Sequence, residues 1–181
     1  MMLEIMKKQE FDQVFSIMER SFPTNEYRNY REQKQLLERP EYCIYVLHDR
    51  KNTDIRAFLA VWRLSDVTFY EHFASAPEVR GQGLGAAVLR EAEQLCPGQI
   101  CLEVEPPETE MAKRRIAFYE RNGFSINDYP YFQPPISEGK QEIPLKIMTS
   151  GGRIGEERFE EIKNRLYREV YQLGDNMVVS A

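Results

Sequence analysis

Apolar and polar positions along the chain follow two periods, one typical of strands and one typical of helices. Runs rich in β-branched and aromatic residues predict strands at 3–7, 42–47, 55–62, 67–75, 99–105, 124–131 and 143–149. Apolar residues three or four positions apart predict helices at 11–22, 24–37, 84–95 and 108–122. A polar turn at 49–54 joins two of the strands. This succession predicts an α/β (α+β) fold with a mixed, strongly bent central sheet flanked by helices on both faces.

A further amphipathic helix is predicted beyond the Ser150-Gly151-Gly152 segment. Its apolar residues recur at three, four, four and three positions: Phe159, Ile162, Leu166, Val170 and Leu173. This stripe must cover apolar surface, and packing on its own domain is favoured over a dimer contact or a substrate lid. At 181 residues the chain is too short for two ordinary domains. We therefore expect a single domain over 1–181, with 151–181 as a C-terminal helical extension.

Three alternating glycines, Gly81, Gly83 and Gly85, lie between the strand at 67–75 and the helix at 84–95. Glycine permits a positive φ and lets a ligand approach the backbone without a Cβ in the way. The start of the helix presents unpaired N–H groups and the positive end of its dipole. The turn is therefore an anion cradle that suits a phosphate or pyrophosphate.

Two other glycine motifs compete for this turn. A Walker A loop is excluded because no Lys-Ser/Thr pair follows the glycines. A dinucleotide fingerprint fits formally, since Gly81, Gly83 and Ala86 match G-x-G-x-x-G/A and Glu103 follows about twenty residues later. That interpretation predicts an NAD(P)-dependent oxidoreductase. Against it, residues 76–80 separate the strand from the glycines, and the chain after 105 lacks room for several more βα units.

The segment 80–85, Arg-Gly-Gln-Gly-Leu-Gly, resembles the acyl-CoA site of the GNAT superfamily of N-acetyltransferases, Q/R-x-x-G-x-G/A at a strand-to-helix junction. A second element of the superfamily matches downstream. It is a helix that ends in a tyrosine, here Tyr119, followed by Gly123-Phe124 and a new strand. The resemblance is clearest over 67–125. One position departs from the pattern, because Ala112 stands where the superfamily often has asparagine.

The resemblance implies an acetyl-CoA cosubstrate and no metal. The residues that it assigns to the coenzyme are Phe73, Ala74, Ser75, Arg80, Gly81, Gln82, Gly83, Leu84, Gly85, Ala86 and Arg115. By the same resemblance, the backbone around Phe73 and Ser75 bonds the pantetheine amides. Lys113, Arg114 and Arg115 add positive charge that suits coenzyme phosphates, although such a run is equally typical of a solvated helix face.

Acyl transfer requires a base that removes a proton from the attacking ammonium. Glu71, on the strand that lies beside the coenzyme by resemblance, is the favoured base and acts through water. Glu103 and Glu105, on the following strand, are the alternatives. Strict alternation puts Glu71 on one face of its strand and His72 on the other. The structural alternative for Glu71 is an ion-paired side chain, and His72 is expected to be a hydrogen-bonded packing residue.

The departing thiolate needs a proton donor. The resemblance assigns this role to Tyr119, whose phenol is protonated at neutral pH. Without the Gly123-Phe124 context, Tyr119 would be interpreted as a core aromatic residue.

The resemblance places the acceptor opposite the coenzyme, between the early helices and the late loops. The candidate substrate-binding residues there are Glu26, Arg28, Tyr30, Glu103 and Tyr131. Aromatic rings with mixed charge suit a small-molecule or peptide amine, yet the same residues can close a core.

Composition limits the remaining possibilities. A formal net charge of -5 argues against nonspecific nucleic-acid binding. Three scattered cysteines without C-x-x-C spacing indicate neither a disulfide framework nor a zinc site. No apolar run suggests export or membrane spanning, so a cytoplasmic location is expected. The sequence thus predicts a cytoplasmic, acetyl-CoA-dependent N-acetyltransferase for a primary amine, either monomer or homodimer. An NAD(P)-dependent oxidoreductase and a non-catalytic acyl-CoA sensor remain alternatives.

Overall fold

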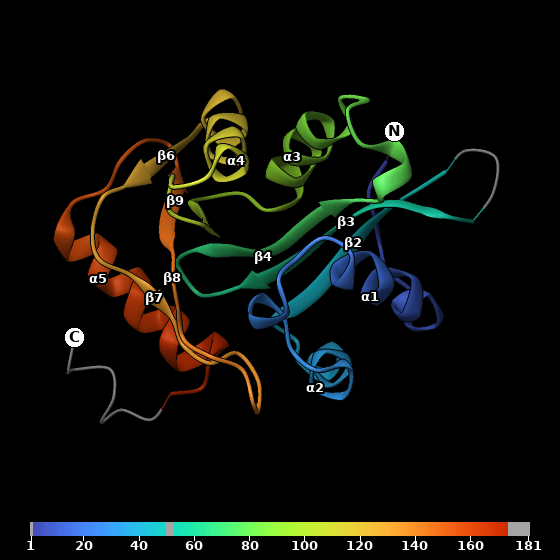
Figure 1. The fold of residues 1–181 in the computed structure, drawn as a ribbon, viewed down its shortest axis with the longest axis horizontal. Coiled ribbons are helices and arrows are strands. Elements are labelled where there is room, and N and C mark those ends of the chain that lie inside the picture. Colours follow the sequence, from blue (N-terminus) through green and yellow to red (C-terminus); the bar gives the residue numbers. More distant parts are fainter. Residues whose placement is uncertain (1, 50–52, 174–181) are drawn as a thin grey trace. The chain divides into compact units, whose positions relative to one another are not determined.

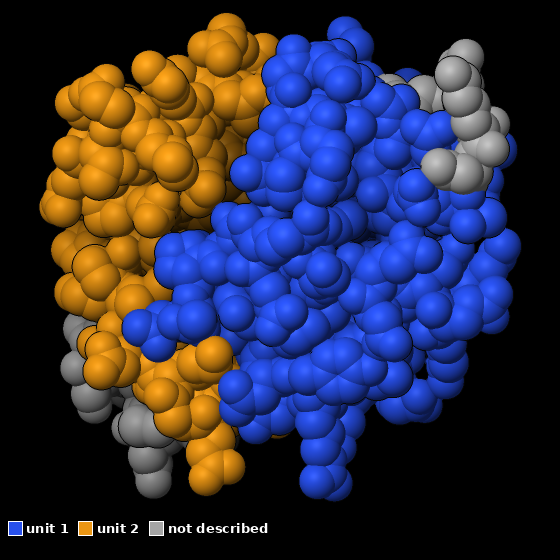
Figure 2. All heavy atoms as spheres, turned by 45° about the vertical axis from the view of Figure 1, so that its right-hand side comes forward, with its two compact units in different colours: residues 1–98 blue, residues 99–181 orange. Residues whose placement is uncertain are grey.

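The computed structural model describes residues 2–49 and 53–173 and divides into two compact units, 1–98 and 99–181 (Figure 1, Figure 2). Part of the predicted turn, 50–52, and the end of the predicted extension, 174–181, lie outside the described residues. Each unit has its own strands, helices and buried side chains. The fold is mixed α/β with mostly antiparallel strands and flanking helices, as predicted. The single domain and the strong bend of the sheet stay predictions.

The first unit contains four antiparallel strands in the order β1-β2-β3-β4. Their bounds are β1 Glu4–Ile5, β2 Tyr42–His48, β3 Ile55–Arg63 and β4 Thr68–Ser75. Helices α1 (Phe11–Glu19) and α3 (Leu84–Leu95) both contact β3 and β4, and they cover opposite faces (Figure 1). Phe58 and Trp62 of β3 and Phe69 of β4 are fully buried as a result. A strand covered on both faces is apolar almost throughout, as β3 is.

The predicted helix over 24–37 is wrong as a single element. A 3-10 helix at Thr24–Glu26 is followed by helix α2, Tyr30–Gln35, and a second 3-10 helix at Leu36–Glu38. Between the first two, Tyr27 is extended, with φ -140° and ψ 155°. The physical reason is tertiary, because extension of the backbone here lets Tyr27 and Arg28 bury their side chains.

A β-bulge interrupts the register between β3 and β4. Ala60 pairs with His72 and Val61 pairs with Tyr70, which leaves Glu71 as the extra residue. The predicted alternation of Glu71 and His72 across the strand is therefore wrong. His72 Nδ1 lies 3.6 Å from Glu71 Oε2, and both side chains contact the segment 22–28.

The predicted order of strand, glycine turn and helix is confirmed. A 3-10 turn at Pro77–Val79 follows β4, and α3 begins directly after Gly83. Gly81 and Gly83 adopt φ values of 79° and 74°, a left-handed conformation that residues with a Cβ rarely take. Gly85 lies in the first turn of α3.

In the second unit, β9 is the central strand of the order β5-β9-β6, and both pairs are antiparallel. The bounds of the strands in this unit are β5 Ile100–Val104, β6 Phe124–Asn127, β7 Phe132–Gln133, β8 Ile143–Pro144 and β9 Lys146–Ser150. Helix α4 (Glu110–Arg121) packs on β5 and β6 and begins where Thr109 Oγ1 accepts a hydrogen bond from Ala112 N at 3.1 Å.

Two strands predicted in this unit have different bounds in the structure. The strand predicted over 124–131 ends at Asn127, whose side-chain amide donates to Ile147 O at 3.2 Å and accepts from Ile154 N at 3.0 Å. The strand predicted over 143–149 is two strands, because Leu145 N bonds Tyr131 O at 3.1 Å instead of continuing the β9 ladder.

The C-terminal extension forms helix α5, Glu156–Arg165, and continues as a π-helix over Leu166–Val170. Its apolar stripe packs on its own unit, as predicted. Phe159 is fully buried, with its ring centroid 4.8 Å from that of Tyr129. Leu173, the last residue of the predicted stripe, lies beyond the end of the helix, so the prediction is wrong at that position. No helix in the part of the chain that the structure describes is long and apolar enough to cross a membrane.

Candidate active site

The glycine turn leaves open space beside its backbone. A Cβ built on Gly81 or Gly83 would meet no heavy atom within 4 Å, and both residues have a positive φ. Together with the N-terminal N–H groups of α3, this open backbone fits the anionic diphosphate of a coenzyme. The predicted anion cradle is thus consistent with the local geometry.

The polar side chains of the turn brace it against the rest of the first unit. Arg80 donates to Ser75 O at 3.3 Å and to Ser21 Oγ at 2.8 Å. Gln82 Oε1 accepts a hydrogen bond from Arg56 Nη2 at 2.8 Å. Ser21 and Arg56 carry no local sequence signal, because they lie far from the glycines in the chain and meet them only in the folded unit.

The other coenzyme candidates in this unit lie beside the turn in sequence. Phe73, Ala74 and Ser75 are on β4 after the bulge and pair with Leu59, Phe58 and Ala57. Leu84, Gly85 and Ala86 form the first turn of α3.

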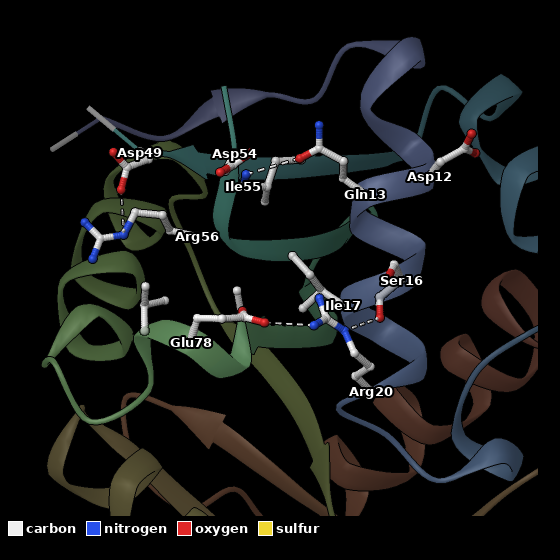
Figure 3. Close-up of a pocket in the computed structure, with 12 residues that line it drawn as sticks. Asp12, Gln13, Ser16, Ile17, Arg20, Asp49, Asp54, Ile55, Arg56 and Glu78 are labelled. Atoms are coloured by element: carbon white, nitrogen blue, oxygen red, sulfur yellow. Dashed lines mark hydrogen bonds and ion pairs between the residues drawn. The ribbon is translucent and has the colours of Figure 1, made fainter. Parts of the chain in front are cut away.

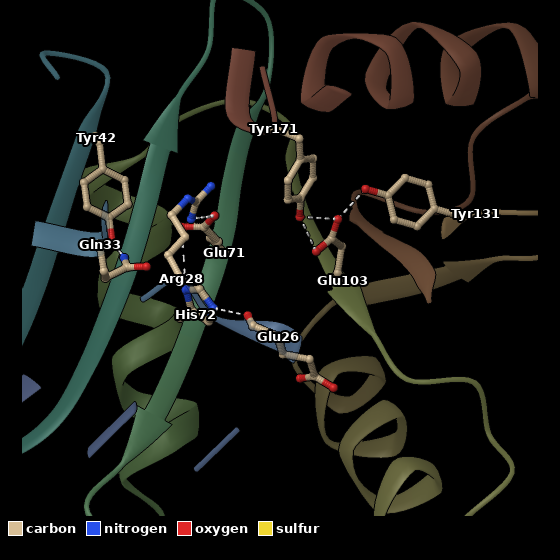
Figure 4. A network of polar contacts seen from close by, with 9 residues as sticks. All are labelled: Glu26, Arg28, Gln33, Tyr42, Glu71, His72, Glu103, Tyr131 and Tyr171. Carbon is tan, nitrogen blue, oxygen red and sulfur yellow. Dashed lines mark hydrogen bonds and ion pairs between the residues drawn. The ribbon is translucent and has the colours of Figure 1, made fainter. Parts of the chain in front are cut away.

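Glu71, the favoured base, forms a buried ion pair. Its Oε1 lies 2.6 Å from Arg28 Nη1, and the two side chains are 1% and 6% exposed (Figure 4). Burial raises the pKa of Glu71, but the Arg28 guanidinium and the contact with His72 outweigh that effect and hold the pKa at about 2. The carboxylate is therefore charged at neutral pH and binds protons weakly.

Neighbouring groups complete this buried cluster. His72 Nε2 lies 2.7 Å from the carbonyl oxygen of Glu26, which can only accept, so this nitrogen carries a proton (Figure 4). The Arg28 guanidinium lies 5.9 Å from the Trp62 ring centroid. Gln33 Nε2 donates to Tyr42 Oη at 2.7 Å. Burial, and then the charge of Glu71, raise the pKa of Tyr42 well above its usual value.

The acceptor candidates of the first unit differ in environment. Arg28 is buried against Glu71, whereas Tyr30 is 42% exposed at the start of α2. The Tyr30 hydroxyl donates to Asp12 Oδ1 and accepts from Lys34 Nζ at 3.0 Å. Glu26 contributes its backbone carbonyl to His72.

Tyr119, the predicted proton donor, is buried on α4 with 8% of its surface exposed. Burial raises the pKa of Tyr119 to about 12, although the charge of Arg115 acts in the opposite direction. The phenol is therefore protonated over the whole neutral range. On the same helix Arg115 lies 3.4 Å from Glu105, and Lys113 pairs with Glu110 at 3.0 Å on the exposed surface.

Glu103 and Tyr131, predicted separately, are brought together in the second unit. Tyr131 Oη donates to Glu103 Oε1, and Tyr171 Oη lies 2.8 Å from both carboxylate oxygens (Figure 4). Burial, and then the charge of Glu103, raise the pKa of Tyr131 well above its usual value, so this phenol remains a donor. Tyr171 was not among the residues predicted from the sequence, because the apolar stripe of the predicted C-terminal helix did not include the tyrosines of that segment.

A separate open cavity of about 560 Å³ lies in the first unit between α1, the β2–β3 hairpin and the turn after β4 (Figure 3). Four of the charged residues that line it form two ion pairs: Arg20 with Glu78 at 2.9 Å and Arg56 with Asp49 at 3.6 Å. The site residues predicted from the sequence are not among those that line it. Among the described residues, no group of three or more His, Cys, Asp or Glu side chains could hold a metal ion.

Comparison with known proteins identifies the class. Residues 40–126 match the family model of the acetyltransferase (GNAT) domain. No curated protein matches the sequence. Among solved structures, a Bacteroides thetaiotaomicron protein described as an acetyltransferase from the GNAT family is 29% identical. That alignment covers 96% of this chain and 100% of the other, with a TM-score of 0.84.

Two more distant structures share the fold. A variant of the spermidine N-acetyltransferase from Vibrio cholerae is 13% identical, with 83% of this chain and 94% of that chain covered and a TM-score of 0.62. An aminoglycoside 6'-N-acetyltransferase, solved with coenzyme A, is 15% identical, with 83% and 96% covered and a TM-score of 0.59. Residues 40–126 thus carry a GNAT acetyltransferase domain, and the protein is an acyltransferase enzyme.

Proposed function

We propose that this protein transfers the acetyl group of acetyl-CoA to a primary amine by direct attack in a ternary complex. The observation that carries the proposal is the open turn at Gly81 and Gly83, which precedes α3 inside the matched GNAT domain. Acetyl-CoA supplies an activated thioester when bound. The residues proposed to hold it are those predicted from the sequence on β4, on the turn and at Arg115.

The three candidate bases differ in the partners of their carboxylates. Glu71 is held by Arg28, and its pKa of about 2 is far from the operating pH that suits a general base. Glu105 lies 3.4 Å from the cationic Arg115. Glu103 is hydrogen-bonded by the phenols of Tyr131 and Tyr171. We propose that Glu103 is the base in place of Glu71, whose buried ion pair with Arg28 opposes proton uptake, and that Glu71 holds Arg28 in position.

Tyr119 is proposed as the proton donor to the departing thiolate. A phenol whose pKa is raised to about 12 keeps its proton at neutral pH and can donate a hydrogen bond to the sulfur as negative charge develops there. A thiol has a pKa near 8.5, below that of this phenol, so transfer of the proton to sulfur is completed as the Tyr119 phenol regains a proton from the amine nitrogen. The amine nitrogen loses two protons in all as the C–N bond forms and the C–S bond breaks: one reaches the sulfur through Tyr119, and the one taken by Glu103 is returned to solvent, which leaves a neutral amide.

The acceptor is proposed to be a small-molecule or peptide amine. The two distant structures carry the names of spermidine and aminoglycoside acetyltransferases, and both of those substrates are polycationic amines. The Glu26, Tyr30 and Tyr131 side chains, together with Arg28, supply the mixed aromatic and charged character that suits such a molecule. We propose a cytoplasmic location, because the three cysteines are scattered and lack the spacing of a disulfide framework, and either a monomer or a homodimer.

A ligand comparison tests the proposal directly. The melting temperature is measured with acetyl-CoA, CoA, NAD and NADP, since a ligand at 100 times its Kd stabilises the native state by about 2.7 kcal/mol. Thiol release from acetyl-CoA is then followed with spermidine, kanamycin and a short peptide. Stabilisation by acetyl-CoA and CoA with amine-dependent release supports the proposal. Stabilisation by NAD or NADP alone refutes it, and binding of acetyl-CoA without release indicates a sensor.

A further inference from the structure

Two elements of the second unit each contribute a phenol that hydrogen-bonds Glu103. Tyr131 belongs to the loop after β6 and approaches only Oε1. Tyr171 belongs to the C-terminal extension, and its hydroxyl lies 2.8 Å from Oε1 and 2.8 Å from Oε2 (Figure 4). A phenol that spans both oxygens restrains rotation of the carboxylate about its terminal bond more than a phenol that approaches a single oxygen.

The backbone departs from regular helix geometry on both sides of Tyr171. The extension winds as a π-helix over Leu166–Val170, so Tyr171 N bonds Leu166 O at 3.0 Å, five residues back. The following residue, Gln172, has a φ of 56°, and among the described residues no other non-glycine has a positive φ. Such conformations cost free energy and persist where the surrounding structure requires them.

The neighbouring tyrosine of the same turn has a different partner. Tyr167 Oη donates to the carbonyl oxygen of Phe132 at 2.6 Å. Tyr167 and Tyr171 are 8% and 9% exposed, and their ring centroids are 6.5 Å apart. Both phenols belong to the C-terminal extension and are similarly buried, and of the two only Tyr171 bonds the Glu103 carboxylate.

Resting on the proposed function, we infer that Tyr171 is a positioning residue that orients Glu103 as the catalytic base. The C-terminal extension lies outside residues 40–126, the segment matched by the family model. The extension thus completes the active site of the acetyltransferase domain in addition to covering apolar surface. It acts through Glu103 and needs no contact of its own with the acetyl group.

Kinetics of paired Tyr→Phe variants test this role. We expect Y171F to lower kcat about tenfold, a part of the 10²–10⁴-fold that a general base contributes, with the KM for acetyl-CoA unchanged. Y167F loses a buried phenol hydrogen bond from the same turn and should keep kcat within about twofold of wild type. E103Q should lower kcat about 100-fold or more. In the E103Q background, Y171F should have no further effect on kcat.

The assay uses acetyl-CoA and one amine. That amine is whichever of spermidine, kanamycin and the short peptide gives the fastest thiol release. Equal kcat losses in Y171F and Y167F would indicate a purely structural role and overturn the inference. So would a rise in the KM for acetyl-CoA as the main effect of Y171F, or additive losses in the double variant. Full activity of E103Q overturns the inference while leaving the acetyltransferase function intact. Absence of thiol release by the wild type with every amine refutes the proposed function, and this inference with it.

Discussion

Replacing Arg28 by methionine removes the cation from a buried carboxylate. Methionine keeps most of the apolar volume against Trp62 but leaves Glu71, which is 1% exposed, without its charged partner. The pKa of Glu71 falls from 4.5 to about 2 in the folded protein. At 1.36 kcal/mol per unit, this shift corresponds to about 3 kcal/mol of stability. Broken buried ion pairs typically cost a similar amount, about 3–5 kcal/mol.

The loss of stability in R28M should depend on pH in a defined direction. Because the folded pKa of Glu71 is depressed, its contribution to stability is fully present above about pH 4.5 and is lost as the pH falls towards about 2. The difference in the free energy of unfolding between wild type and R28M should therefore be largest near neutral pH and should decrease under acid conditions. For a chain of this length, about 3 kcal/mol lowers the melting temperature by about 6–12 °C.

Thermal unfolding from pH 7 to pH 3 measures both effects. Arg20 provides the matched control, because its ion pair with Glu78 is exposed, and R20M should melt close to wild type at every pH. The double variant R28M/E71Q should recover much of the loss, because neither charge is then buried alone. The reasoning would be refuted if the melting temperature of R28M at neutral pH fell no further than that of R20M, or if its decrease were independent of pH.

Two further predictions concern the proposed site. Y119F should lower kcat by about 10²-fold without weakening acetyl-CoA binding, since only the donated proton is lost, and an unchanged kcat would remove Tyr119 from the mechanism. G83A should cost about 1–2 kcal/mol and weaken acetyl-CoA binding, because φ at Gly83 is 74°. Gly155 precedes α5 with a φ of -74°, so G155A should leave both quantities unchanged in melting and titration experiments. Normal acetyl-CoA binding by G83A would argue against the predicted cradle.

The features that follow from local sequence were predicted well. Alternating or helical periodicity located the strands around the core and the helices α1, α3, α4 and α5. The glycines of the turn were recognisable because a positive φ is a property of the backbone at one residue. The resemblance to the GNAT superfamily rested on these local features, and the match of 40–126 confirms it.

The environment of each candidate side chain was decided by tertiary structure. Whether Glu71 is free or paired depends on the bulge in β4 and on Arg28, 43 residues away, and no local pattern records either. Tyr171, one of the two phenols that hydrogen-bond Glu103, is likewise 68 residues away, directly after a π-turn that helical periodicity did not predict. Sequence by itself determined the chemical groups and the elements that carry them. Contacts between distant segments decided that Arg28 pairs with Glu71 and that phenols hydrogen-bond Glu103, because charge and burial act through space.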